Sequence, residues 1–151
     1  MTVTLHFCAG TDLDAATLYE LLQLRAEVFV EEQACPYPEL DGRDLVATTR
    51  HFWLRDSGGA VVANLRLLED VTDAEGEFRI GRVCTRLSAR GRGHTRLLME
   101  AALAQVGDRP CRLNAQSYLT AMYAGHGFAT DGEEFLEDGI PHVPMRRIVA
   151  S

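Results

Sequence analysis

The segment from Phe78 to Ala115 constrains the fold of this chain more than any other. Phe78 to Thr85 has the composition of a strand, and a loop rich in glycine and arginine follows it directly. Apolar residues then recur at helical spacing up to Gln105, and Pro110 to Ala115 forms a second short strand. A strand, a helix and a strand in this order predict a parallel β-α-β crossover.

The residues before this unit predict a strand at 3–7, a helix over about 12–30, a long loop at 31–49 and a hairpin at 51–67. Thr11 offers an N-cap for the helix, and the long loop contains Pro36, Pro38 and Gly42. Asp56-Ser57-Gly58-Gly59 separates the two arms of the hairpin. Long loops in compact domains are usually functional, so residues 31–49 are of interest.

The C-terminal part predicts a short helix over 118–124 and a closing hairpin whose last arm spans 143–150. The chain contains no repeat, low-complexity tract or linker. We therefore expect one domain over residues 1–151, of the α+β class, with a mixed sheet.

Charge and cysteine content exclude several classes of protein. The net charge of −7 disfavours sequence-independent binding to nucleic acid, which depends on Lys and Arg. No apolar run reaches the length of a membrane span, and no signal peptide is evident, so we expect a cytoplasmic protein with no membrane partner. The scattered Cys8, Cys35, Cys84 and Cys111 form no Cys-x-x-Cys pair and indicate free thiols, with no metal site. Nothing near Cys35 marks it as a nucleophile.

The loop of the β-α-β unit has the composition of a phosphate-binding turn. It reads Arg90-Gly91-Arg92-Gly93-His94-Thr95, with Arg96 just inside the helix. Glycines allow backbone N–H groups to turn inward, and a helix N-terminus adds partial positive charge. The loop lacks the ending of a nucleoside-triphosphate P-loop and the complete dinucleotide fingerprint. A pyrophosphate group of another kind of ligand fits it better.

This loop resembles the acyl-CoA-binding motif of the GNAT superfamily, Arg/Gln-x-x-Gly-x-Gly/Ala. Arg90 and Gly93 match the motif, and Thr95 stands where the family has Gly or Ala. The resemblance implies the GNAT fold, in which two central strands splay apart and hydrogen-bond the CoA arm. It implies acetyl-CoA as co-substrate, held by the following residues: Val83, Cys84, Thr85, Arg90, Gly91, Arg92, Gly93, His94, Thr95 and Arg96.

Two further segments carry the resemblance. Tyr123-Ala124-Gly125-His126-Gly127-Phe128 matches the family's Tyr-x-x-x-Gly-Phe, whose Tyr lies beside the CoA sulfur. Leu24 to Gln33, Asp41-Gly42 with Asp44, and Glu137 to His142 look like ElaA-like GNAT proteins. The likeness then covers residues 18–146 and implies direct N-acetyl transfer in a ternary complex, with Tyr123 as general acid.

The acceptor of such a reaction must lose a proton, because an alkyl ammonium with a pKa near ~10.4 is not a nucleophile. Five residues are candidates for the base: Glu32, Asp41, Asp44, His51 and His142. The two prolines beside His142, Pro141 and Pro144, restrict the backbone there, although a structural role for this histidine fits equally well. Asp41, Asp44 and the acidic residues of 133–138 lead us to expect a cationic primary amine as acceptor.

Two alternatives stay open. A non-catalytic acyl-CoA sensor would keep the phosphate loop and lose turnover. An acyl-homoserine-lactone synthase shares the segment from Leu24 to Phe29, although 151 residues are few for that family. The sequence leaves the acceptor, the length of the acyl chain and the choice between monomer and homodimer open.

Overall fold

The computed structural model describes residues 2–34, 39–70 and 76–149. Cys35, with its neighbours up to Pro38, lies outside the described residues. The elements follow in this order: β1 (Thr4–Ala9), η1 (Gly10–Asp12), α1 (Ala15–Arg25), η2 (Ala26–Glu32), β2 (Arg50–Arg55), β3 (Val61–Glu69), β4 (Phe78–Thr85), η3 (Leu87–Ala89), α2 (His94–Val106), β5 (Cys111–Gln116), η4 (Ser117–Leu119), α3 (Thr120–Ala124), β6 (Ala129–Thr130), β7 (Phe135–Glu137) and β8 (Ile140–Arg147).

The strands form one mixed sheet in the order β1-β2-β3-β4-β5-β8-β6, with β7 added beside β8. Among the described strands, β4 and β5 run parallel and every other neighbouring pair is antiparallel. The β-α-β crossover is therefore confirmed, with α2 as its helix. None of the helices in the described ranges is long and apolar enough to cross a membrane.

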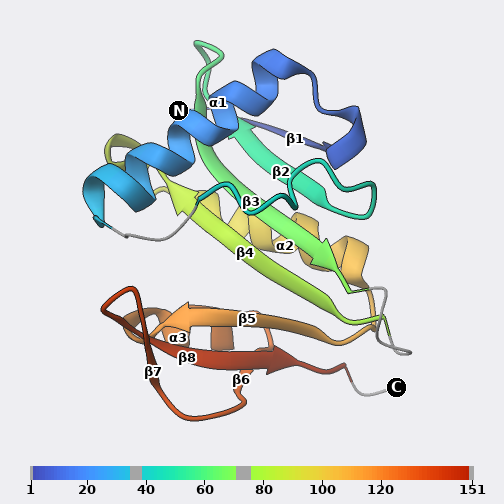
Figure 1. Cartoon of the computed structure of the whole chain (residues 1–151), viewed down its shortest axis with the longest axis vertical. Helices are drawn as coiled ribbons and strands as arrows, with labels where there is room; N and C mark the ends of the chain where they lie inside the picture. Colours follow the sequence, from blue (N-terminus) through green and yellow to red (C-terminus); the bar gives the residue numbers. More distant parts are fainter. Residues whose placement is uncertain (1, 35–38, 71–75, 150–151) are drawn as a thin grey trace.

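Helices cover both faces of the sheet around β3, with α1 on one face and α2 on the other (Figure 1). Leu21 and Leu24 of α1 pack on Trp53, while Leu98 and Met99 of α2 belong to the cluster around Phe52 on the opposite face. This double cover explains why β3 is buried from Val61 to Leu68 without alternation.

The first helix differs from its prediction at both ends. Asp14, and not Thr11, is the N-cap: its Oδ1 accepts from the backbone N–H of Thr17 at 2.7 Å. The helix changes after Arg25 into seven residues of π-helix, η2, which ends at Glu32. Such π segments are frequent at functional sites.

The closing hairpin is also shifted from its prediction, because β8 spans Ile140–Arg147 instead of 143–150. Its turn is Asp138-Gly139, with φ of 52° and 78° at the two residues. Two successive positive φ angles are typical of the tight type I′ turn, which favours Gly at its second position. This turn pairs β7 with the start of β8 and carries Glu137 next to Ile140.

Candidate functional site

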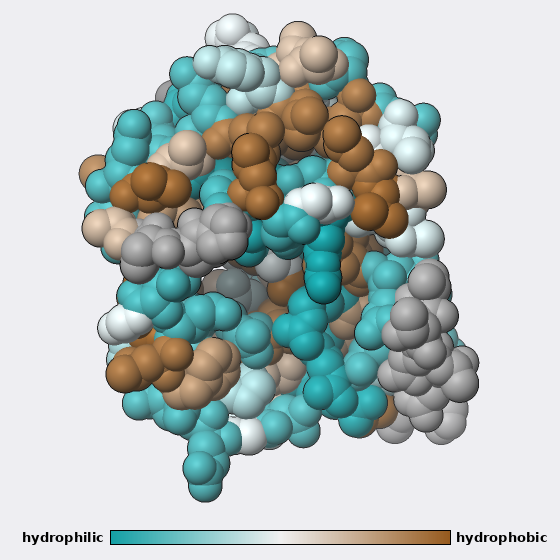
Figure 2. Space-filling model, in the orientation of Figure 1, coloured by the Kyte–Doolittle hydropathy of each residue, from teal (hydrophilic) through white to brown (hydrophobic). Residues whose placement is uncertain are grey.

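The parallel strands β4 and β5 separate soon after they meet. They pair only at Phe78 with Cys111 and at Arg79 with Arg112, and the remaining residues of each strand diverge (Figure 1). The predicted splayed pair is thus confirmed. A cavity of about 800 Å³ opens between the strands. Figure 2 shows the surface hollowed at this place, with hydrophilic residues along the edge of the hollow.

A bulge in β4 shapes one wall of this cavity. The β3–β4 register shifts between Asn64 and Arg66, and Arg82 has a φ of 52°. The buried Asn64 donates from Nδ2 to the carbonyl of Arg82 at 2.9 Å. Since β5 has already diverged, the free edge of β4 from Gly81 to Thr85 lines the cavity. This edge presents backbone groups to any molecule bound between the strands.

The loop after β4 presents the N-terminus of α2 to the same cavity. Gly91 and Gly93 have φ of 77° and 79°, a left-handed conformation that favours glycine, although a Cβ at either position would meet no atom within 4 Å. Gly93 is the N-cap and offers no side chain to the first N–H groups of α2. His94 is buried, and its Nδ1 has no partner within the described ranges. A helix N-terminus without a side-chain cap favours a bound anion through its first N–H groups and the helix dipole.

Arg90 holds this loop in place. Its Nε donates to the carbonyl of Thr85 at 2.9 Å, and its two terminal nitrogens each lie 2.7 Å from a carboxylate oxygen of Glu32. This bidentate pair joins the loop to the end of the π-helix. The hydrogen bonds from Arg90 lower the pKa of Glu32, so that carboxylate is a weaker base than usual.

The thiol of Cys84, beside the loop, has little reactivity of its own. Burial raises the pKa of Cys84 to about 12, so its thiol stays protonated at neutral pH. The side-chain oxygens of Thr85 and Thr95 lie 3.5 Å apart. Thr95 therefore directs its hydroxyl toward the end of β4, at the position where the GNAT motif has a smaller residue.

Tyr123 lies on the opposite wall, in α3. Its side chain is 6% exposed, packs edge-on against Phe128 at 6.3 Å and lines the cavity. Its hydroxyl makes no hydrogen bond with any residue that the structure describes. Burial, with a smaller contribution from Tyr118, raises the pKa of Tyr123 to about 12. The phenol is thus a protonated group with a free donor.

His142 lines the cavity where β8 begins. Its Nδ1 donates to the carbonyl of Ile140 at 2.7 Å, because a carbonyl oxygen can only accept. Its Nε2 lies 3.4 Å from a carboxylate oxygen of Glu137, and its ring stacks on Phe135. The contact with Ile140 places the proton of the neutral ring on Nδ1 and leaves the lone pair on Nε2.

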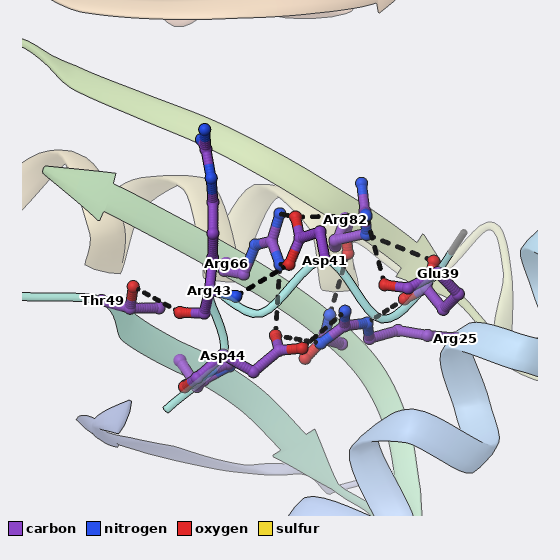
Figure 3. Close-up of polar contacts among 10 residues, drawn as sticks. Arg25, Glu39, Asp41, Arg43, Asp44, Thr49, Arg66 and Arg82 are labelled. Atoms are coloured by element: carbon purple, nitrogen blue, oxygen red, sulfur yellow. Dashed lines mark hydrogen bonds and ion pairs between the residues drawn. The ribbon is translucent and has the colours of Figure 1, made fainter. Parts of the chain in front are cut away.

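An arginine–carboxylate network lies beside the cavity, formed by Arg25, Arg66, Arg82, Glu39, Asp41 and Asp44 (Figure 3). The buried Arg25 contacts both Glu39 and Asp44, the latter at 2.7 Å. Arg66 bridges Asp41 at 2.7 Å and Asp44 at 3.2 Å. Three cations and three anions cancel, so this network has no net charge with which to attract an amine.

Contacts with the network or burial beside it make three of the candidate bases poor proton acceptors. Burial alone would raise the pKa of Asp41, but hydrogen bonds from Arg66 and the Arg43 backbone outweigh it and lower that pKa to about 2. Asp44 is buried between Arg25 and Arg66 and does not line the cavity. His51 is fully buried, with Nε2 at 2.8 Å from the carbonyl of Asp44, and burial lowers its pKa.

The cavity thus brings together Tyr123, His142, Asp41, Glu32 and most of the residues expected at the CoA arm, but neither Asp44, His51 nor Arg92. Sequence reasoning missed Asn64 and the buried network. A charged residue such as Arg66 within an apolar strand was the available signal, because a buried arginine requires a partner. Among the described residues, no group of three or more His, Cys, Asp or Glu could hold a metal ion.

Both the sequence and the fold of this chain are similar to those of known proteins. A family model described as an acetyltransferase (GNAT) domain matches residues 17–149. A UPF0039 protein of Mycobacterium tuberculosis is 65% identical over 147 residues, 97% of this chain and 94% of that protein. An acyl-CoA N-acyltransferase from Pseudomonas aeruginosa has a TM-score of 0.89 at 45% identity, covering 97% and 99% of the two chains. Escherichia coli ElaA has a TM-score of 0.88 at 36% identity, with the same coverage.

Proposed function

Since the chain belongs to the GNAT acetyltransferase family, we propose that it transfers an acetyl group from acetyl-CoA to a primary amine within a ternary complex. One observation carries the proposal. A single cavity collects an uncapped helix N-terminus, the free edge of β4 and the free hydroxyl of Tyr123. These are the groups that bind a pyrophosphate, hold a thioester arm and protonate a thiolate.

We place the pyrophosphate of CoA at the Gly91–His94 turn and the pantetheine arm along the edge of β4. The first N–H groups of α2 and the dipole of this helix favour the phosphate charges there. Val83, Cys84 and Thr85 line the cavity and would offer backbone groups to the arm. Arg90 acts by fixing the turn through Glu32, and Arg96 forms a solvent-exposed pair with Glu100 at 2.9 Å.

The transfer then needs a general base, a hydrogen-bond donor for the oxyanion and a general acid. His142 Nε2 accepts the proton of the ammonium, and the free amine attacks the thioester carbonyl carbon. A backbone N–H on the edge of β4 donates to the oxyanion. As the C–S bond breaks, Tyr123 donates its proton to sulfur, and the nitrogen passes its second proton to the Tyr123 phenolate, which restores the phenol. His142 then releases its proton to solvent. The sum is an amide, the free thiol of CoA and one proton.

A thiol-release assay tests this proposal. The purified protein is incubated with acetyl-CoA and a panel of amines, amino acids, polyamines and peptides, and free thiol is measured over time. We expect turnover with at least one primary amine and a loss of kcat in His142→Asn. His6→Asn is a matched control, because His6 is exposed on β1 and lies outside the cavity. Calorimetric binding of CoA without turnover of any acceptor would favour the sensor and contradict the enzyme.

A further inference from the structure

Two arginines line the cavity and have no partner among the residues that the structure describes. Neither the guanidinium of Arg43 nor that of Arg79 forms an ion pair or hydrogen bond with another residue in the described part of the chain. This distinguishes them from Arg66 and Arg82, which line the same cavity but are paired with Asp41. The unpaired positive charge of the cavity wall therefore comes from Arg43 and Arg79.

The backbone holds Arg43 in a defined place. Its N–H donates to Asp41 at 3.0 Å, and its carbonyl accepts from the hydroxyl of Thr49 at 2.8 Å. Figure 3 shows the side chain of Arg43 extending away from the carboxylates of the network. Its charge is thus available to a molecule in the cavity, while Asp41 and Thr49 fix its main chain.

Arg79 lies where the cavity begins. It occupies the last paired position of β4 and β5, where its partner is Arg112. On the other side of β4 its partner is Leu68 of β3. Arg112 is already bound to Glu77 at 2.7 Å, so it adds no free charge. An unpaired guanidinium in a concave site favours a bound anion, and the planar fork of arginine suits a carboxylate.

The opposite end of the cavity carries negative charge. Glu137 and Asp138 line it at the β7–β8 turn, beside His142. Arg79 pairs with Arg112 and His142 with Gln116, and these two β5 residues are four positions apart. With a rise of about 3.3 Å per residue, the backbones of Arg79 and His142 are therefore offset by about 13 Å along the direction of β5. Their side chains can shorten this distance by extending into the cavity. Arg79 and the acidic β7–β8 turn therefore lie at different levels along the diverging strands.

We propose that the acceptor carries a carboxylate in addition to its amine, with the carboxylate bound by Arg43 and Arg79 and the amine directed to His142 and Glu137. This inference rests on the proposed function and names the substrate class of the same site. It replaces the expectation of a purely cationic amine, because Asp41 and Asp44 are neutralised within the network. An acceptor of amino-acid or small-peptide type has the required pair of charges.

Matched pairs of small molecules test the proposal. Glycine, γ-aminobutyrate and ε-aminocaproate are compared with ethylamine, butylamine and hexylamine, in which a methyl group replaces the carboxylate. Each is titrated by calorimetry into CoA-saturated protein and assayed for turnover with acetyl-CoA. We expect at least one amino acid to bind about tenfold or more tightly than its amine, as two charge-assisted hydrogen bonds imply.

Substitutions of the two arginines test whether they bind the carboxylate. Arg43→Gln and Arg79→Gln should each weaken binding of the preferred amino acid about tenfold and leave the Kd of CoA unchanged. Arg55→Gln removes the same charge from a pair with Glu20 away from the cavity and should change neither value. Equal or tighter binding of the alkylamines, no binding in either series, or an unchanged preference in both cavity variants would overturn the inference. Carboxylate-selective binding without turnover would support it while contradicting the proposed transfer.

Discussion

Removal of a single hydroxyl isolates the role proposed for Tyr123. Tyr123→Phe keeps the ring, its edge-on contact with Phe128 and its volume. The hydroxyl has no hydrogen-bond partner among the described residues, so its loss leaves no buried group unsatisfied. We therefore expect the free energy of unfolding to change by less than about 1 kcal/mol. The Kd of CoA should also be nearly unchanged.

The effect on catalysis should be much larger. With a pKa of about 12, Tyr123 is protonated at every pH at which the enzyme would be assayed. A thiolate with a pKa near ~8.5 leaves more readily when a donor protonates it as the C–S bond breaks. Loss of a general acid typically lowers the rate by about 10²-fold or more, and we expect this fall in kcat.

Steady-state and single-turnover measurements with acetyl-CoA and the preferred acceptor provide the assay. An acetyl donor with a more acidic thiol should recover part of the rate lost in Tyr123→Phe, because it needs less protonation. The wild-type rate should also show no fall near pH 10, since the pKa of this phenol is raised from 10.0 to about 12. Wild-type turnover in Tyr123→Phe, with the chemical step rate-limiting, would refute the assignment and leave a packing role.

Three other changes probe the loop, the network and the core. Gly93→Asp puts a side chain and a negative charge at a left-handed N-cap, so calorimetry should detect no CoA binding by a variant with a native circular dichroism spectrum. Arg25→Met leaves Asp44 buried with one partner fewer and should cost about 3–5 kcal/mol in urea unfolding, and a cost below about 1 kcal/mol would contradict the role of the network. Burial raises the pKa of Cys84 and Cys111 from 9.0 to about 12, so the stability they contribute is complete below pH 9 and is lost as pH rises toward 12. A flat dependence of unfolding free energy on pH between 9 and 12 would disprove this.

The order of elements followed from the sequence because it depends on local patterns. The β-α-β unit, the glycine loop before α2 and the β2–β3 hairpin are each specified by neighbours within a few residues. The Tyr123 segment and the loop also carried the family resemblance, which the comparisons confirm. The predicted start of the first helix was wrong: Asp14, and not Thr11, is the N-cap, because its carboxylate accepts from a backbone donor of the first turn.

Tertiary structure alone decided what each polar side chain of the site does. Asp41, Asp44 and His51 are similar candidates in the sequence, yet only Asp41 lines the cavity, and its pKa is low because Arg66, 25 residues away, is bonded to it. Arg79 has the same chemistry as Arg66 but no partner among the described residues, and it lines the cavity at the last position where β4 and β5 pair. Ion pairing and burial depend on contacts between distant segments, and local sequence patterns do not specify them.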